Sequence, residues 1–283
     1  MASMVKESIK GGGEQAWRVP LRWSAVLLVT VTWVSAAVFG TYIVSFFGGA
    51  ALRGSPERWN ESLPALFDRA GPVGTAAIGA HFLAGGLLLL LGPVQLISPI
   101  RRAAPALHRR LGRAYVLAAG VAGAGGLGFI LARGTIGGPV MDFGFGLYGL
   151  LVVAAAGLTW RRARARRWDA HRAWAIRLFA LVIGSWLYRM EYGFWFLTAG
   201  RIGHTGDFTG WFDAVMAFGF YLPNLVVAEL FIRARRWPAN SVLAYAAVTS
   251  LAAASLFVVV ATWVFTTDYW GPGVVSGLTG TPL

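Results

Sequence analysis

The chain of 283 residues is 57% hydrophobic and only 13% charged, whereas a soluble domain has about 45–50% apolar and about 25% charged residues. This composition excludes an ordinary soluble domain and predicts an all-α membrane protein. The net charge of +13 does not indicate nucleic-acid binding, because the basic residues cluster between apolar segments, where they would contact lipid headgroups. The absence of cysteine excludes disulfides, iron–sulfur clusters and thiolate catalysis.

Seven apolar segments are long enough to cross a bilayer, which needs about 20 apolar residues for each helix. We therefore predict a bundle of seven transmembrane helices at residues 23–47, 74–98, 114–132, 142–160, 173–198, 211–232 and 241–266. The first segment is longer than the apolar part of a signal peptide, about 7–15 residues, and is expected to stay in the protein.

The lysines and arginines between these segments predict the orientation of the bundle. The connections on one side hold eighteen of them and those on the other side hold five. Because short cytoplasmic loops are enriched in basic residues, the N-terminus is expected in the cytoplasm and the C-terminus outside. The predicted organisation is a polar cytoplasmic leader at 1–22, one membrane domain at 23–266 and a flexible external tail at 267–283.

A partial internal repeat lies in the two most basic connections, "PIRRAAPALHRRLGRAYV" and "RRARARRWDAHRAWAIR". Each places a His-Arg pair at the start of a predicted helix and a further arginine one or two turns later. The two sets are His108, Arg109 and Arg113, and His171, Arg172 and Arg177. A duplicated two-helix hairpin explains this pattern most simply.

Charged residues inside the predicted helices are expected to face the bundle interior, because a charge in lipid costs at least about 2.5–3.5 kcal/mol. The helical rise of about 1.5 Å per residue gives their depths and predicts two polar layers. The outer layer consists of His81, Arg189 and Glu191. The inner, cytoplasmic layer consists of His108, His171, Arg113, Arg177, Asn224 and Glu229. Arg189 and Glu191 lie two residues apart, point in different directions and are not expected to pair.

A simpler interpretation of the inner layer needs no ligand. Arg177 and Glu229 would then reach the membrane interface with their long side chains. His108 and His171 would contact lipid headgroups.

Three further features are expected to be structural. His204 lies in the segment "GRIGHTGDF" and is expected to be a solvated loop residue. Asp213 begins a predicted helix and would only stabilise its dipole. The glycines of "GVAGAGGLG", residues 120–128, are expected to pack helices together, with admission of a flat ligand as the alternative.

Histidines on facing helices can ligate haem b, and nearby arginines can pair with its propionates. His108 and His171 are the predicted iron ligands, because they begin the repeated helices at equal depth. The cations expected around them are Arg109, Arg113, Arg172 and Arg177. His81 has no second histidine at its depth, so one haem is expected rather than two. The same side chains around an apolar cavity would also suit a quinone or another small-molecule ligand.

Other classes of function stay open. A transporter or proton-coupled permease would use the charges within the helices, which are Arg177, Arg189, Glu191 and Glu229. A membrane assembly or interaction factor would need no such chemistry. A zinc hydrolase is disfavoured, because the predicted topology places His81 near one face and His108 and His171 near the other. We therefore favour a membrane redox or cofactor-binding protein.

The motifs of residues 74–232 resemble a family of bacterial membrane proteins catalogued as domain of unknown function 2306. The stretches that carry the resemblance are "GAHFLAGGLLLLLGPVQLISPIRRAAPALHRRLGRAYVLA", "DAHRAWAIRLFALVIGSWLYR" and "LPNLVVAEL". The matching positions are His81, Leu91, Gly92, Pro93, Gln95, His108, Arg109, Gly112, Arg113, Asp169, His171, Arg172, Trp174, Arg177, Arg189, Pro223, Asn224 and Glu229. Asp169 lies two residues before His171, where the family pattern has four. The resemblance implies a multi-pass protein of the bacterial cytoplasmic membrane and brings no established activity.

Overall fold

The computed structural model describes residues 2–62, 66–67, 69, 85–237 and 240–283, and the regular elements within these residues are helices. The helices that make up the main bundle are α1 (Ala2–Tyr42), α6 (Pro105–Arg133), α7 (Gly138–Arg164), α8 (Trp168–Ala199), α9 (Trp211–Gly219), which continues as α10 (Leu222–Arg236), and α11 (Ser241–Phe265). The short ones are η1 (Ile43–Gly48), α2 (Gly49–Leu52), η2 (Pro56–Arg58), α3 (Trp59–Ser62), the helix Gly85–Leu96, α5 (Ser98–Ala103), η3 (Thr266–Trp270) and α12 (Gly271–Thr279). The expectation of an all-α chain is confirmed.

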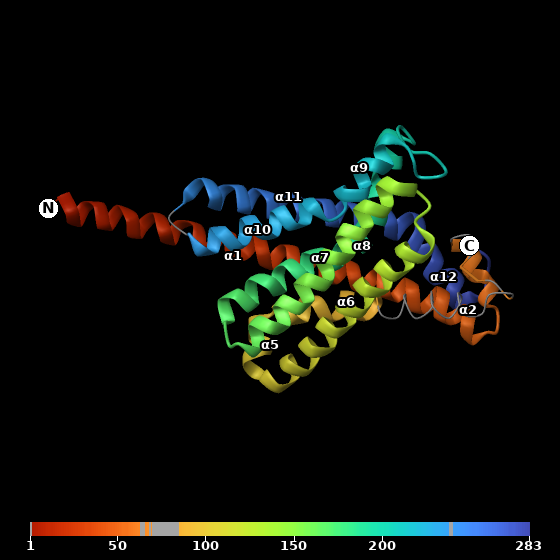
Figure 1. Ribbon diagram of the computed structural model, residues 1–283, viewed down its shortest axis with the longest axis horizontal. Helices are drawn as coiled ribbons and strands as arrows, with labels where there is room; N and C mark the ends of the chain where they lie inside the picture. The colour runs from red at the N-terminus through yellow and green to blue at the C-terminus, as the bar shows by residue number, and fades with distance from the viewer. Residues whose placement is uncertain (1, 63–65, 68, 70–84, 238–239) are drawn as a thin grey trace.

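The long helices form an antiparallel bundle (Figure 1). α7 packs between α6 and α8, and α11 packs between α1 and α10. α1, α6, α8 and α11 run in one direction, while α7 and α9–α10 return. The connections at 98–113, 161–172 and 233–237 therefore meet at one end of the bundle, which we call the basic end.

Among the described residues, five helical segments are long and apolar enough to cross a membrane: Trp17–Leu52, Pro105–Leu131, Gly138–Arg164, Trp211–Arg236 and Ser241–Thr279. Each coincides with one of the predicted spans, although the span 114–132 extends one residue beyond Leu131. The predicted span 173–198 lies within α8, which has sufficient length but carries several charges. The first part of the predicted span 74–98, residues 74–84, falls outside the described residues, and the part that follows forms a helix at Gly85–Leu96. The chain is thus a membrane protein with several apolar helices that contact lipid.

The segment 267–283, for which the sequence predicts a flexible external tail, is helical as far as Thr279. The chain continues from α11 through η3 into α12, which packs against η1. Gly273 and Gly277 lie one turn apart on α12, and the ring of Tyr42 and the backbone of Ser45 leave no room for a Cβ at either position. A small-xxx-small pair of this kind allows close helix packing, and here it brings α12 against the end of α1 and η1.

Polar contacts also fasten α12 to the segment after α2. The guanidinium of Arg58 donates to the Ser276 hydroxyl at 2.8 Å and to a carboxylate oxygen of Glu61 at 2.9 Å. The other oxygen of Glu61 accepts from the backbone N–H of Leu283 at 3.1 Å. The partners lie more than two hundred residues apart, so no local pattern in the sequence indicates them.

The predicted span 211–232 is a broken helix, with α9 ending at Gly219 and α10 beginning at Leu222. Pro223 lacks the N–H that would continue the helix across the break. Unpaired backbone is costly within a membrane, and here the amide of Asn224 donates to the carbonyl of Phe220 at 2.9 Å. The buried Tyr221 hydroxyl donates to the carbonyl of Gly144 at 3.2 Å.

Two glycines allow neighbouring helices to reach this break. A Cβ on Gly144 of α7 would lie 2.5 Å from the carbonyl oxygen of Ala217. A Cβ on Gly184 of α8 would lie 2.9 Å from that of Phe220. Both separations are closer than packed atoms tolerate, so only glycine fits without a shift of the backbone.

Gly144→Ala is expected to destabilise the protein by about 1–3 kcal/mol, because overpacking against backbone atoms cannot be relieved by a side-chain rotation. Gly146→Ala is the matched control, since a Cβ at that position of the same helix meets nothing within 4 Å. Thermal unfolding in detergent checks both variants. Equal melting temperatures for the two would contradict the close packing at the break.

Acid is expected to loosen α12. The hydrogen bond from Arg58 holds the pKa of Glu61 below its ordinary value, with a smaller contribution from the Leu283 N–H. A carboxyl group whose pKa is lowered by folding stabilises the fold above its unfolded pKa, about 4.3, and this contribution disappears as the pH falls through the lowered pKa. Hydrogen exchange of residues 271–283, corrected for intrinsic rates, should therefore accelerate in acid.

Glu61→Gln should show that acceleration already at neutral pH, whereas Glu57→Gln, at an exposed position, should match the wild type. Unchanged exchange in Glu61→Gln would show that the carboxylate does not fasten the segment.

Candidate functional site

His171 lies in the first turn of α8 and is held by the neighbouring helix. Its Nδ1 lies 3.1 Å from the carbonyl oxygen of Thr159 on α7. Because a carbonyl only accepts, Nδ1 carries a proton, and in the neutral imidazole Nε2 then keeps its lone pair. This is the arrangement in which a histidine commonly serves as a metal ligand, with a backbone carbonyl fixing the ring.

His108 lies in the first turn of α6, within electrostatic range of His171. The start of α6 is defined by Pro105, a residue well suited to a helix N-terminus. The Nδ1 atom of His108 is enclosed and has no hydrogen-bond partner in the described part of the chain. The structure thus places the two predicted iron ligands at the same end of the bundle.

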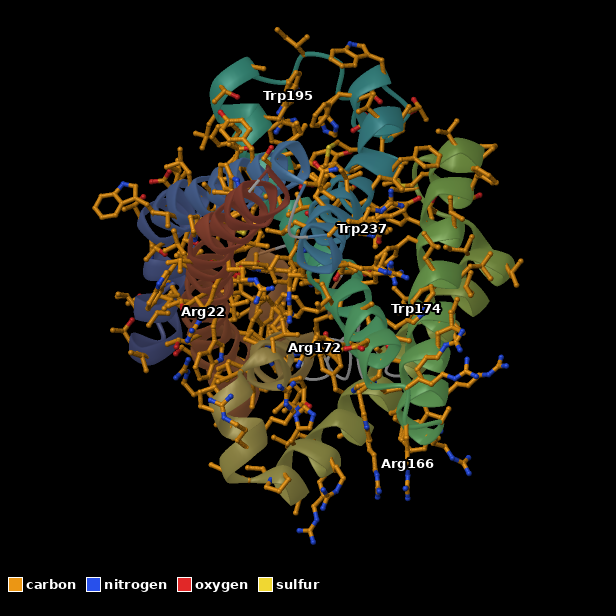
Figure 2. All side chains as sticks on the ribbon, turned by 90° about the vertical axis from the view of Figure 1, so that its left-hand side faces the viewer. Arg22, Arg166, Arg172, Trp174, Trp195 and Trp237 are labelled. Carbon is orange, nitrogen blue, oxygen red and sulfur yellow. The ribbon has the colours of Figure 1, made fainter. Side chains whose placement is uncertain are left out.

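Arginines from three helices surround this end. Arg101 of α5, Arg172 of α8 and Arg235 of α10 lie within electrostatic range of one another. Figure 2 looks onto the basic end and shows Arg172 near its middle, whereas Arg166 points outward at its edge. Burial, followed by repulsion from Arg172, lowers the pKa of Arg101. Like charges held together in this way favour the binding of an anion.

Two of the expected propionate partners have other roles. The guanidinium of Arg177 donates to Glu229 on α10 at 2.6 Å and lies over the ring of Trp174 at 4.8 Å. The second oxygen of Glu229 accepts from Arg233 at 2.8 Å. Arg113 lies away from the histidines, at the end of a groove between α6 and α7. Arg109 is exposed and within electrostatic range of His108.

The outer-layer residues are only partly described. His81 lies outside the described residues. Arg189 lies within electrostatic range of the Tyr42 hydroxyl. One carboxylate oxygen of Glu191 is enclosed without a hydrogen-bond partner among the described residues. Arg189 and Glu191 form no ion pair with each other in that part of the chain. Asn224 serves the helix break, as described above.

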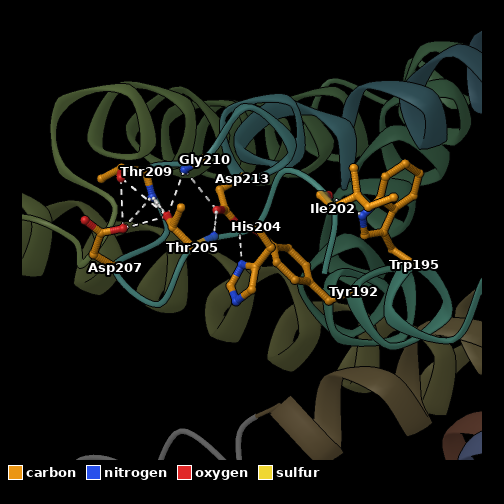
Figure 3. Close-up of polar contacts among 9 residues, drawn as sticks. All are labelled: Tyr192, Trp195, Ile202, His204, Thr205, Asp207, Thr209, Gly210 and Asp213. Atoms are coloured by element: carbon orange, nitrogen blue, oxygen red, sulfur yellow. Dashed lines mark hydrogen bonds and ion pairs between the residues drawn. The ribbon is translucent and has the colours of Figure 1, made fainter. Parts of the chain in front are cut away.

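A second polar cluster at the opposite end is absent from the expectations. The buried carboxylate of Asp213 accepts from the Tyr192 hydroxyl at 2.8 Å and from Nδ1 of His204 at 2.7 Å (Figure 3). Its other oxygen accepts from the backbone N–H groups of Thr205 and Gly210, each at 3.1 Å. The expectation of a solvated His204 is wrong, because this side chain is 7% exposed.

The aromatic rings of Phe196, Phe208 and Tyr192 enclose the imidazole of His204. Asp213, at the third position of α9, also does more than stabilise a helix dipole, because it closes the loop that precedes the helix. The sequence contains one signal for this, a histidine nine residues before an N-terminal aspartate. The loop that joins them is not predictable from local pattern.

Among the described residues, no three His, Cys, Asp or Glu side chains gather closely enough to hold a metal ion by themselves. A haem needs only two axial ligands from the protein. His108 and His171 have the donor chemistry for that role, and they lie within electrostatic range of each other.

Comparison with known proteins gives a family but no activity. A family model described as "Predicted membrane protein (DUF2306)" matches residues 78–232. No curated protein and no solved structure matches the chain. The match confirms the resemblance inferred from the sequence motifs, and it covers the histidines of the basic end and the ion pair of Arg177 with Glu229.

Asp213→Asn is expected to destabilise the protein by about 3 kcal/mol, because an amide cannot satisfy the four donors that surround this buried carboxylate. The control is Asp207→Asn in the same loop, whose side chain is exposed and whose partners water can replace. Thermal unfolding in detergent provides the comparison. If Asp213→Asn and Asp207→Asn have the same melting temperature, the cluster around Asp213 does not stabilise the fold.

Proposed function

The chain belongs to the DUF2306 family of predicted membrane proteins, and we propose that it binds a redox cofactor, haem b, at the basic end. Its iron ligands in this proposal are His108 and His171. The observation that carries the proposal is the hydrogen bond from Nδ1 of His171 to the Thr159 carbonyl. It fixes the tautomer that presents Nε2 to an iron atom.

The cations at the same end support an acidic cofactor. The haem propionates are carboxylates, and arginine pairs with a carboxylate through two parallel hydrogen bonds. Arg101, Arg172 and Arg235 come from three different helices, so they can hold a ligand only at the centre of the bundle end. Within the described part of the chain, Arg172 and Arg101 act electrostatically on Arg235 together with the carboxylate of Asp169.

The roles of this chain's own residues follow from their positions. Haem b, when bound, supplies one-electron chemistry. The Thr159 carbonyl of α7 would hold the imidazole of His171 in its orientation. His108 of α6 would contribute the second imidazole. The arginines would neutralise the carboxylates of the cofactor and so fix which edge faces water. A quinone in place of haem would accept hydrogen bonds from the same imidazole and guanidinium groups.

We also propose a full topology of seven spans, with α8 and the segment 74–98 as the two beyond the apolar five. The basic end then lies in the cytoplasm and α12 lies outside, in a bacterial cytoplasmic membrane. The distribution of arginine and lysine supports this orientation. The charges of α8 are compatible with a span because Arg177 is paired with Glu229 on α10.

A transporter is the second candidate, and the broken helix α9–α10 favours it. Helices interrupted at membrane depth often form substrate sites in transporters. The state of Glu229 weighs against proton coupling through this residue, because two arginines hold its carboxylate. The ion pair of Arg177 with Glu229 is therefore interpreted as a contact that holds α8 against α10.

The haem proposal predicts an absorption spectrum. Protein expressed with a supply of haem and purified in detergent should show a Soret band, and an α-band after reduction with dithionite. His108→Ala and His171→Ala should each lose the bands while keeping the helical circular dichroism of the wild type. His204→Gln is the control, because His204 lies at the opposite end of the bundle.

A flat spectrum from folded, haem-replete protein would overturn the haem proposal. Binding of a soluble quinone analogue that requires His171 would then assign the same site to a quinone. Substrate movement into vesicles that depends on Asn224, with no cofactor bound, would favour the transporter.

A further inference from the structure

The outer surface of α6 and α7 contains a groove that neither the fold nor the proposed function uses. Its volume is about 530 Å³, and its walls include Leu117, Gly120, Val121, Gly157 and Trp160, with Arg113 at one end. Leu117 and Val121 are 69% and 64% exposed. Because α6 and α7 are both membrane-spanning candidates, these apolar side chains face lipid.

The glycines of α6 differ in whether they contact α7. A Cβ on Gly123 would lie 3.0–3.2 Å from atoms of α7, so this residue packs the two helices together. A Cβ on Gly120, Gly125, Gly126 or Gly128 would meet nothing within 4 Å. The expectation that these glycines pack helices is therefore correct for Gly123, while Gly120 and Gly157 keep the groove open.

The dimensions of the groove suit one acyl chain. From Arg113 to Ala124 the helix rises about 16 Å. One leaflet of the hydrocarbon core is about 15 Å thick, half of the full core. The groove thus extends from the interface toward the middle of the bilayer, along the path of a lipid tail.

Arginines at one end of the groove favour an anionic headgroup. Arg113 is exposed and has no ion pair among the described residues. Helical spacing brings four more arginines to the same end of this face: Arg109, Arg110, Arg161 and Arg164. The one acidic residue of α6 and α7 is Asp142, which lies at the far end and accepts from the backbone N–H of Thr135. Trp160 lies among these cations, as tryptophan does at membrane interfaces.

We propose that this groove is a binding site for one anionic phospholipid, with its acyl chain between α6 and α7 and its phosphate at Arg113. A second copy of the chain fits less well, although α6 has small residues at 120, 124 and 128. Two chains in the same membrane orientation would bring their arginine-rich ends together, and neither α6 nor α7 has a carboxylate at that end to compensate the repulsion. The site is separate from the histidines and does not depend on haem binding.

The test is native mass spectrometry of the full chain with phosphatidylglycerol and, for comparison, phosphatidylcholine. We expect one tightly bound phosphatidylglycerol and weaker binding of phosphatidylcholine. Arg113→Gln should weaken phosphatidylglycerol binding about tenfold, because it removes a charge-assisted hydrogen bond. Arg236→Gln, on α10 away from the groove, should leave it unchanged.

The apolar part of the site is tested by filling it. Gly157→Leu should weaken phosphatidylglycerol binding without unfolding the protein, because its Cβ has open space, and Gly120→Leu repeats the test from the other helix. Gly126→Leu is the matched control, since it is equally open but does not line the groove. Retained binding in Arg113→Gln, or in both groove-filling variants, would overturn the proposal. Loss of a dimer instead of a lipid in Gly157→Leu would assign the groove to a second copy of the chain.

Discussion

The polar contacts between α8 and the broken helix α9–α10 are the constraint on which the rest of the structure depends. Two polar contacts join them, Tyr192 with Asp213 and Arg177 with Glu229. Between these two, Gly184 allows the backbone of Phe220 to approach α8 closely. The positions on α8 are spaced by seven and eight residues, so they lie on one face. A charged helix would be costly in lipid, and this face removes its polar groups from lipid by pairing them within the bundle.

This constraint also sets the place of the candidate site. With α8 fixed against α10 on one side and α7 on the other, its first turn carries His171 and Arg172 to the centre of the basic end. The same anchoring brings Arg235 of α10 beside them. The site is therefore assembled by helix packing and not by a local motif, although a local His-Arg motif supplies two of its members.

The sequence predicts the elements better than their partners. Length and hydropathy give the long helices, and helical depth correctly groups Arg177 with Glu229 at one level. Their direct pairing could not be predicted, because periodicity gives the face of a helix and not the helix that it meets. His204 and Asp213 were missed for a related reason, since their contact depends on the conformation of an intervening loop. The order of residues 267–283 depends on partners near the other terminus, beyond the reach of local pattern.

The orientation of α8 across the membrane is the claim that most directly supports the account, and the absence of cysteine makes it measurable. Arg167→Cys and Gly206→Cys place one thiol before α8 and one in the loop after it. In intact cells, a membrane-impermeant maleimide should label Gly206→Cys, whereas Arg167→Cys should be labelled only after the membrane is opened. Labelling of both from the same side would show that α8 does not cross the bilayer, and the proposed topology would fail with it.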